Sequence, residues 1–435
     1  MTEALPQYDN QSGIQPDNQS GIQPDGALSA ALRGELSEEL RGRMHSMYKH
    51  LHANPELSMQ EHATARFIAE RLDALGIGNF ACGSTGVVGV LRSGDGPVIG
   101  FRADTDGLPI LEDTGLDYAS TARGVLADGT GVPVMHGCGH DTHVATLLTA
   151  AELLAGATES WRGTVVFIFQ PGEETAAGAQ AMIEDGIWDK APRPEIIYGQ
   201  HVMGNEAGTI NISIGNAMAM ADSLKVTVFG RQSHGSQPQV AIDPIVLGAQ
   251  MVLRLQTIVS REVHPLKAAV VTVGTFHAGL KENIIPATAE FTLNIRTLEP
   301  EVRAQVLAAV RRIILAEADA SGAPLPEITE LYTFPRNYNQ PAATEQLIEA
   351  FRAALGAENV AVVEPMMGSE DFGAFAEAIG VPSVYWMFGG MSREVLDSGR
   401  PVPMNHSPYF APVIEPTLST GVRAALAAIL SKLGK

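Results

Sequence analysis

The sequence predicts an α/β fold in which a mostly parallel sheet carries helices on both faces and is interrupted by a smaller, inserted α+β sandwich. Short strands that are apolar on both faces, at residues 98–102 and 165–170, alternate with helical segments such as residues 144–155. Strands of this kind are typical of parallel sheets between two layers of helices. The pattern changes after about Ala219 and the alternation resumes at residue 344, which indicates that one unit interrupts the other.

The first stretch of the chain is expected to lie outside the fold. Residues 9–16 read DNQSGIQP, and residues 17–24 repeat these letters without change. A polar tandem repeat with Pro and Gly in each unit cannot bury a core, so residues 1–26 are predicted to form a disordered tail. From residue 32 to 52 the apolar spacing fits one amphipathic helix, which Asn54-Pro55 ends.

The larger domain is predicted to be built from two segments, residues 27–219 and 332–435. Strands at residues 87–91 and 98–102 belong to the first segment, and a helix at 418–433 closes the second. A chain of 435 residues is too long for one simple core, so two domains are the default expectation.

The inserted domain is predicted to span residues 220–331. Its expected elements are a strand at 223–230, a helix at 241–260, strands at 268–276 and 287–297, and a helix at 300–319. This β-α-β-β-α order is the split βαβ pattern of a small open-faced sandwich. Chemistry in such an arrangement usually lies where the two domains face each other.

Composition narrows the classes of partner. A net charge of −20 and a pI near 5.0 disfavour nucleic acid and anionic membranes, which bind basic patches. A small molecule, or another copy of the chain, is the expected partner. With only Cys82 and Cys138, no secretory signal and no apolar run of about 20 residues, the expected location is the cytoplasm.

Residues 136–143, which read HGCGHDTH, are the stretch richest in chemistry. They hold three imidazoles, a thiol and a carboxylate, and two glycines let the backbone turn tightly. So many borderline-soft ligands in eight residues indicate a transition-metal site. A lone buried Cys or His is more often structural, so the interpretation requires further ligands elsewhere in the chain.

Further candidate ligands lie after two predicted strands. The strand at 165–170 leads into Glu173 and Glu174, two adjacent carboxylates that repel each other unless a cation lies between them or one is protonated. A second strand ends at His201, and His406 lies far along the chain. With the thiol and imidazole of residues 136–143, these side chains suffice for two metal ions and leave one carboxylate to deprotonate a water.

Six motifs, in order along the chain, carry a resemblance. They are FRADTDGLP at 101–109, MHGCGHDTH at 135–143, QPGEE at 170–174, GQH at 199–201, MGSEDF at 367–372 and NH at 405–406. With them the chain, from about residue 40 to its end, resembles the amidohydrolase branch of the M20 metallopeptidase family. That branch includes hippurate hydrolases, N-acyl-amino-acid amidohydrolases and auxin-conjugate hydrolases. The resemblance implies a di-metal peptidase-like catalytic domain with an inserted dimerisation and lid domain.

The resemblance also implies the metal ligands and the general base. The implied ligands of two divalent metals are Cys138, His140, Glu174, His201 and His406. The implied base is Glu173. The wider family begins its site with a His two residues before an Asp, whereas this chain has Asp104 and Asp106. Cys138 is therefore taken as the ligand that substitutes for the missing His. The roles of Asp106, His136 and His143 are left open, and each is a candidate for a residue that contacts and orients a metal ligand.

Three residues of the inserted domain match family positions around the substrate. His234, in GRQSHG, resembles a His that reaches the partner subunit's site, where it would donate to the oxyanion. A second His common in the branch is missing near Gln239. Asn283 and Arg296 match positions near the substrate carboxylate, which a guanidinium fork binds well. An Arg paired on an exposed strand remains an equal alternative for Arg296.

The predicted function is metal-dependent hydrolysis of the amide bond of N-acyl amino acids, by a homodimer or higher homo-oligomer. Zinc, manganese, cobalt and nickel all suit the ligand set. The alternatives are a dipeptidase, a deacetylase of the N-acetyl-diaminopimelate type, and a binding protein without catalysis. Six other histidines are not expected to be metal ligands. Those of the early helices are expected to be surface or interhelical residues, and the other two lie beside inserted strands: His45, His50, His52 and His62, then His264 and His277.

Overall fold

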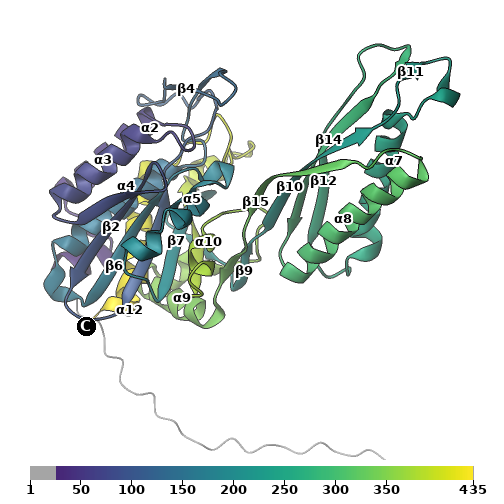
Figure 1. The fold of residues 1–435 in the computed structure, drawn as a ribbon. Helices are drawn as coiled ribbons and strands as arrows, with labels where there is room; N and C mark the ends of the chain where they lie inside the picture. The colour runs from purple at the N-terminus through teal and green to yellow at the C-terminus, as the bar shows by residue number, and fades with distance from the viewer. Residues whose placement is uncertain (1–25, 435) are drawn as a thin grey trace, which may run out of the picture.

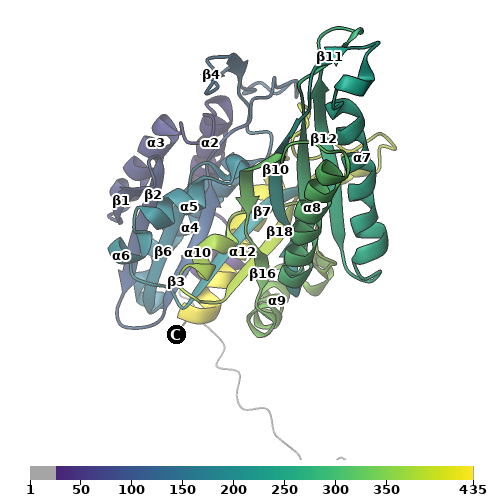
Figure 2. The ribbon, with the colours of Figure 1, turned by 45° about the vertical axis from the view of Figure 1, so that its right-hand side comes forward.

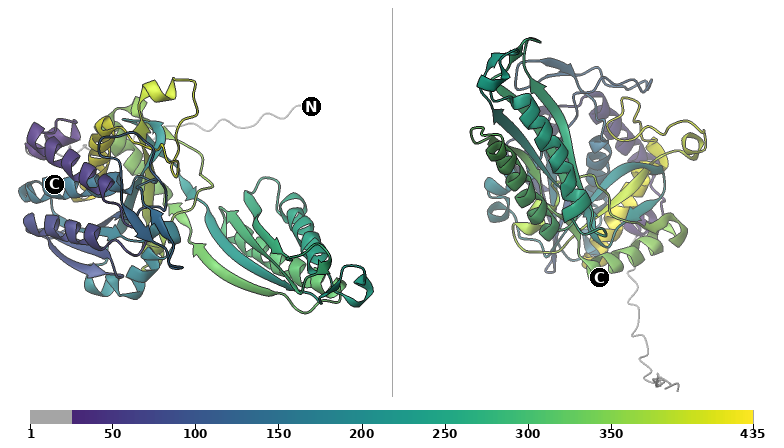
Figure 3. Two further views of the ribbon diagram at one scale, coloured as in Figure 1. Left: turned by 90° about the horizontal axis from the view of Figure 1, so that it is seen from above. Right: turned by 90° about the vertical axis from the view of Figure 1, so that its right-hand side faces the viewer.

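The computed structural model describes residues 26–434, so the predicted tail at residues 1–26 lies almost wholly outside the described residues. Figure 1 shows a larger unit and a smaller unit that extends away from it, and the left view of Figure 3 shows the same arrangement from above. Among the residues described, no helix is both long and apolar enough to cross a lipid bilayer.

The larger unit is built on a ten-stranded sheet of order β1-β2-β6-β3-β7-β18-β16-β9, with β8 paired to β17 and β18. The strands are β1 (Gly78–Cys82), β2 (Gly86–Ser93), β3 (Val98–Asp104), β6 (Gly163–Gln170), β7 (Ile196–Glu206), β8 (Ile210–Ile212), β9 (Gly215–Met218), β16 (Asn337–Asn339), β17 (Val360–Val362) and β18 (Ser383–Met391). The central pairs β6–β3, β3–β7 and β7–β18 are parallel, and the edge pair β1–β2 is antiparallel.

Helices cover both faces of this sheet (Figure 2). They are α1 (Ala27–Leu32), α2 (Glu38–Ala53), α3 (His62–Ala74), α4 (His140–Ala155), α5 (Gly178–Glu184), α6 (Ile187–Lys190), α9 (Pro341–Leu355), α10 (Gly373–Glu377), α11 (Arg393–Leu396) and α12 (Ile414–Leu433). The central strand β6 is wholly buried, and its alternate residues enter two cores. Val165 and Phe167 pack with α2, α4 and α12, whereas Val166 and Ile168 pack with α5, α6 and α10. The predicted α/β sheet between helices is confirmed.

The smaller unit is a four-stranded antiparallel sheet of order β12-β14-β10-β15. Its elements are β10 (Met220–Phe229), α7 (Pro244–Thr257), β12 (Ala269–Ala278), β14 (Thr288–Thr297), α8 (Pro300–Ala320) and β15 (Glu327–Phe334). The helices bury one face of the sheet in a core of its own, which includes Val226, Met251 and Phe291. A short pair of strands, β11 (Ser233–His234) and β13 (Ile284–Ile285), forms the end remote from the larger sheet (Figure 1). The hairpin β4 (Arg123–Val125) and β5 (Gly131–Pro133) belongs to the larger unit.

Two local expectations were wrong. The helix expected from residue 32 to 52 begins only at Glu38, because α1 ends at Leu32, Gly34 has a φ of 85°, and Ser37 starts α2 by accepting a hydrogen bond from the Leu40 N–H at 3.2 Å. The strand β15 was not expected, and the proposed boundary after residue 331 falls inside it. The boundary at residue 220 coincides with the first residue of β10. The division into domains therefore stays a proposal.

Candidate metal centre

Three of the predicted ligands, and the predicted base, lie at two tight turns. Cys138 and His140 lie on either side of a glycine whose φ of 84° is left-handed, and His140 is the first residue of α4. Glu173 and Glu174 come after β6 and a second glycine with a φ of 56°. Both pairs lie at the carboxyl end of the parallel strands, where functional side chains of α/β sheets gather.

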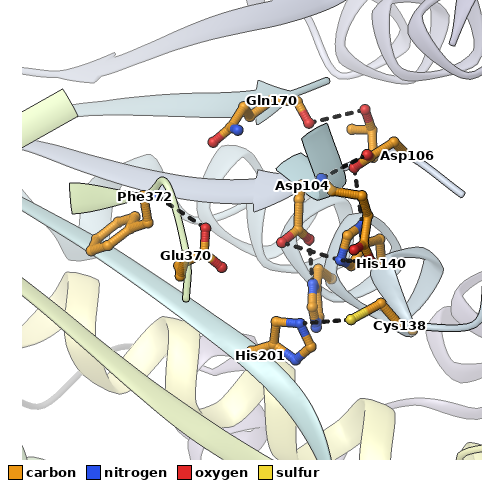
Figure 4. Close-up of polar contacts among 12 residues, drawn as sticks. Asp104, Asp106, Cys138, His140, Gln170, His201, Glu370 and Phe372 are labelled. Carbon is orange, nitrogen blue, oxygen red and sulfur yellow. Dashed lines mark hydrogen bonds and ion pairs between the residues drawn. The ribbon is translucent and has the colours of Figure 1, made fainter. Parts of the chain in front are cut away.

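The two remaining predicted ligands come from β7 and from the loop before α12. The expectation that a strand ends at His201 was wrong, because β7 continues to Glu206. His201 Nε2 lies 3.4 Å from Cys138 Sγ, and its Nδ1 lies 2.7 Å from the Val202 backbone oxygen. His406 Nε2 lies 3.3 Å from Glu174 Oε1. Figure 4 shows Cys138, His140 and His201 pointing toward one another.

These five side chains form two groups that share one thiol. Cys138, His140 and His201 place their ligand atoms within 4.8 Å of one another, as do Cys138, Glu174 and His406. His140 Nε2 and Glu174 Oε1 are buried and form no hydrogen bond within the described residues. They lie 3.9 Å from each other, and Glu174 Oε1 lies 3.3 Å from His406 Nε2, so these atoms converge at contact distances. The set of thiol, imidazole and carboxylate fits transition metals. The residues present therefore fit a metal centre.

Asp106 holds His140 from behind. Asp106 Oδ1 lies 3.1 Å from His140 Nδ1, while Asp106 Oδ2 accepts from the Ser58 hydroxyl at 2.7 Å and from the Glu174 N–H at 3.1 Å. Burial alone would lower the pKa of His140, but Asp104 and the hydrogen bond to Asp106 raise it to about 10. A carboxylate in this position fixes the ring so that Nε2 faces the other ligands.

The other two histidines of residues 136–143 are buried but not equivalent. His143 is hydrogen-bonded through Nδ1 to Asp104, and its Nε2 accepts from the Val202 N–H at 2.8 Å, so both ring nitrogens are engaged. His136 is 2% exposed, and neither of its ring nitrogens has a partner among the described residues. Burial lowers the pKa of His136 to about 4.

Glu173 is 5% exposed and lies in a group with Glu370 and Asp371. Burial, followed by Glu370 and Glu174, raises the pKa of Glu173 well above its usual range. Burial likewise raises the pKa of Asp371 to about 8, with Glu370 adding to the effect against the opposing charge of Arg102. A carboxyl group in these surroundings holds a proton more readily than an ordinary Glu does.

A buried arginine counters these carboxylates, and its role was not predicted from the sequence. Arg102 donates to Asp104 at 2.6 Å, to Glu370 at 2.8 Å and to Asp371 at 3.2 Å, and its side chain is fully buried. Nε of Arg102 donates to Gln170 at 2.7 Å. β3 is buried along almost its whole length, but Gln170, Glu370 and Asp371, which Arg102 contacts, lie far along the chain from it.

A cavity of about 540 Å³ joins the predicted ligands to the smaller unit. Its lining includes Cys138, Glu173, Glu174, His201, His406 and Arg296. Nη1 of Arg296, on β14, donates to the Met367 backbone oxygen at 2.8 Å and to the Ser369 hydroxyl at 3.2 Å. The structure thus places Arg296 in the same cavity as the ligands.

His234 and Asn283 lie elsewhere. His234 is on β11 at the far end of the smaller unit, is exposed, and its Nδ1 lies 2.7 Å from the Ser236 hydroxyl oxygen. Asn283 is close by, because its backbone oxygen accepts from the Gly235 N–H at 2.8 Å. Neither residue lines the cavity that contains Glu173. β11, which carries His234, lies at the end of the smaller unit that is remote from the larger sheet (Figure 1).

His52 was expected to be a surface or interhelical residue, and it is an interhelical one with two acidic partners. It is 1% exposed, its Nδ1 lies 2.6 Å from Asp141 Oδ2, and its Nε2 lies 3.0 Å from Glu112 Oε1. Burial would lower the pKa of His52, but these two carboxylates raise it to about 10. His52 thus ties α2 to the first turn of α4, next to His140.

Comparison with known proteins gives consistent matches. The model of peptidase family M20/M25/M40 matches residues 100–431. Hippurate hydrolase of Campylobacter jejuni is 38% identical over 75% of this chain and 83% of its own length. N-acetyl-L-cysteine deacetylase of Bacillus subtilis is 36% identical over 78% and 79%. The crystal structure of Bacillus subtilis YXEP, described as a dinuclear metal-binding peptidase of the M20 family, is 31% identical, covers 91% of this chain and 99% of its own, and has a TM-score of 0.73.

Proposed function

The chain belongs to peptidase family M20/M25/M40, and from this membership we propose that it is a metal-dependent amidohydrolase that cleaves the amide bond of N-acyl amino acids. The products are a carboxylate and a free amino acid. The observation that carries the proposal is the sharing of one cavity by the buried carboxyl group of Glu173, four of the five metal-ligand candidates and Arg296. The fifth candidate, His140, lies within 4.8 Å of Cys138 and His201, which line that cavity. The matched relatives act in the same class of reaction by their names.

Two divalent metals are proposed to be held by Cys138, His140, Glu174, His201 and His406. When bound, such ions polarise the amide carbonyl and lower the pKa of a water. We propose zinc, manganese, cobalt or nickel, since thiol and imidazole ligands accept each of them. A ligand thiol also fits the cytoplasm, and Cys82 and Cys138 are both free.

Glu173 is proposed to move the protons of the reaction. Its carboxylate takes a proton from the attacking water and delivers that proton to the nitrogen of the leaving amino acid. The raised pKa of the buried Glu173 carboxyl suits the second step, because the group then holds the proton until the amine leaves. Arg296 is proposed to bind the carboxylate of the amino acid through Nη2, because its Nε donates to Asn294 and its Nη1 donates to Met367 and Ser369.

His234 is proposed to act in the site of a partner subunit, where it would donate to the oxyanion. The proposal is supported by the position of His234 at the exposed end of the smaller unit. A surface suited to a second copy lies beside it: Val246 and Leu253 on α7 are 57% and 67% exposed, and Leu280, beyond β12, is fully exposed. β12 is also an edge strand of the four-stranded sheet. These features support a homodimer through this unit.

The test is release of free amino acid from N-benzoylglycine, N-acetyl amino acids and indole-acyl amino acids by enzyme reloaded with each of the four metals. Hydrolysis that a chelator abolishes and added metal restores is expected. If the enzyme hydrolyses only dipeptides, it is a dipeptidase. If it hydrolyses only N-acetyl-diaminopimelate, it is a deacetylase of that type. Two bound metals with no turnover on any substrate would favour a binding protein. For the dimer, mixing inactive His234→Ala and Glu173→Gln chains should restore part of the activity, because one of the two mixed sites then holds both groups.

A further inference from the structure

A second cavity, of about 360 Å³, lies beside the one that contains Glu173. Met203, Met366 and Met387 line both cavities, and Met404 lines the second one. The two cavities therefore meet at a wall of thioether side chains. We call the second cavity the methionine chamber, defined by these four methionines together with Ala217 and Val363.

The chemistry of the chamber contrasts with that of its neighbour. The larger cavity carries the cation Arg296 and ionisable ligand candidates, whereas the one charged residue in the lining of the chamber is Glu364, which is exposed. The lining also has the polar side chains of Asn205, Asn211 and Ser213; Asn205 donates to Thr209, and Ser213 donates to the Glu364 backbone oxygen. The hydroxyl of Tyr385, which also lines the chamber, donates to Glu370 at 2.5 Å and is not free for a ligand. The chamber thus suits an apolar group next to a charged one.

Met404 brings the chamber close to the predicted metal ligands. A Cβ added at Gly204 would lie 2.6 Å from Met404 Sδ, so the absence of a side chain at Gly204 lets Met404 lie over β7. Met404 is two residues before His406, which contacts Glu174. A group held in the chamber would therefore touch the loop that supplies one of the predicted ligands.

We propose that the methionine chamber binds the acyl group of the substrate and selects apolar acyl groups that contain an aromatic ring. An N-acyl amino acid has a carboxylate on one side of its amide and the acyl group on the other. With Arg296 in the larger cavity as the cation for the carboxylate, the apolar chamber is left for the acyl group. This inference rests on the proposed function.

Methionine suits this role physically. Its unbranched side chain has three rotatable bonds and a polarisable sulfur, which makes favourable contacts with aromatic rings. The three shared methionines can change rotamer to join the two cavities when an acyl group enters. A volume of about 360 Å³ falls in the range of small-molecule pockets.

The test compares two substrates on three proteins, with glycine as the constant amino acid. The measured quantity is the ratio of kcat/KM for N-benzoylglycine to that for N-acetylglycine. Val363→Phe places a ring in the chamber, and Val362→Phe places the same ring one residue earlier, at a 50% exposed position outside both cavities. We expect a wild-type ratio above about 10, a fall of roughly tenfold or more in Val363→Phe, and a change below about twofold in Val362→Phe.

The outcomes separate this inference from the proposed function. A ratio that Val363→Phe leaves unchanged overturns the chamber as the acyl site. The inference is also overturned if Val363→Phe changes the preference between N-acetylglycine and N-acetylphenylalanine instead. The side chain of the amino acid, and not the acyl group, would then occupy the chamber. Should metal-loaded wild type hydrolyse neither of these substrates nor any other N-acyl amino acid of the panel, the proposed function fails. Calorimetric binding of N-benzoylglycine to Glu173→Gln, with and without Val363→Phe, then still tests the chamber.

A second variant guards against misfolding of Val363→Phe. Met366→Ala enlarges the chamber at the shared wall, so the preference should shift toward the larger indole-3-acetyl group relative to benzoyl, by about fivefold or more. An unchanged preference between these two acyl groups in a folded Met366→Ala protein contradicts the inference.

Discussion

Asp106 lies directly behind His140, with Oδ1 3.1 Å from the Nδ1 of the imidazole, and leaves Nε2 facing the other predicted ligands. Replacing Asp106 by Asn is expected to weaken metal binding by roughly 10–100-fold, because the amide neither fixes the ring as firmly nor increases its basicity. Competition with a chromogenic chelator measures this affinity. Ser58→Ala, which removes a hydrogen bond to the other Asp106 oxygen, is the control and should lower the affinity less.

Glu173→Gln keeps the shape of the side chain and removes its ability to accept a proton. We expect kcat to fall by about 10²–10⁴-fold while the metal content per chain stays at its wild-type value. The activity assay gives kcat, and atomic absorption on the same sample gives the metal content per chain. Full turnover by this variant would remove Glu173 from the mechanism.

Arg296→Lys should act on substrate binding more than on the chemical step. Loss of the guanidinium fork is expected to raise KM by roughly 10–100-fold for substrates with a free carboxylate, with a smaller change in kcat. The matched substrate is the corresponding amino-acid amide, which has no carboxylate to lose. An equal effect on acid and amide would limit Arg296 to its hydrogen bonds with Asn294, Met367 and Ser369.

Arg102→Met is expected to destabilise the protein by about 3–5 kcal/mol, because it leaves buried carboxylates without their cation. Urea denaturation followed by circular dichroism gives the free energy of unfolding. Arg312→Met, which breaks an exposed pair with Glu262, serves as the control and should change stability little. Equal effects of the two substitutions would show that the buried network contributes no more than a surface pair.

His52 should make stability depend on pH. Its folded-state pKa of about 10 lies above the ordinary value of 6.5, so the protonated ring stabilises the fold fully below pH 6.5, and this contribution is lost as the pH rises toward 10. In metal-free protein, the difference in unfolding free energy between wild type and His52→Gln should be on the order of 3 kcal/mol at about pH 6 and should shrink steadily above about pH 7. A difference that stays constant from about pH 6 to 10 would contradict the charged ring.

The sequence was sufficient to predict the layered sheet, because β6 and β3 are apolar on both faces and local pattern shows this directly. It also picked out the side chains that meet around Cys138, since each lies in a short motif. The sequence did not indicate which side chains pair with His52 and Arg102. Glu112 and Glu370 lie far along the chain from them, and a lone charged residue in a strand or helix carries no local sign of its partner.

Segment boundaries were predicted less well, for local reasons. The break before α2 depends on one glycine with a positive φ and on a serine cap, and both fit within an otherwise continuous apolar period. β15 is mostly exposed, so its sequence lacks the apolar face that marks β10 and β14. Such an element becomes evident only from its pairing with β10.

The chain enters and leaves the four-stranded sheet at neighbouring positions, because Ala221 on β10 pairs with Phe334 on β15. In terms of chain connectivity, residues 222–333 are thus a single large loop whose two ends already touch. A short turn joining Ala221 to Phe334 would replace this loop at little entropic cost and leave the register of the larger sheet intact. A different domain can therefore be inserted between Ala221 and Phe334 in place of the smaller unit.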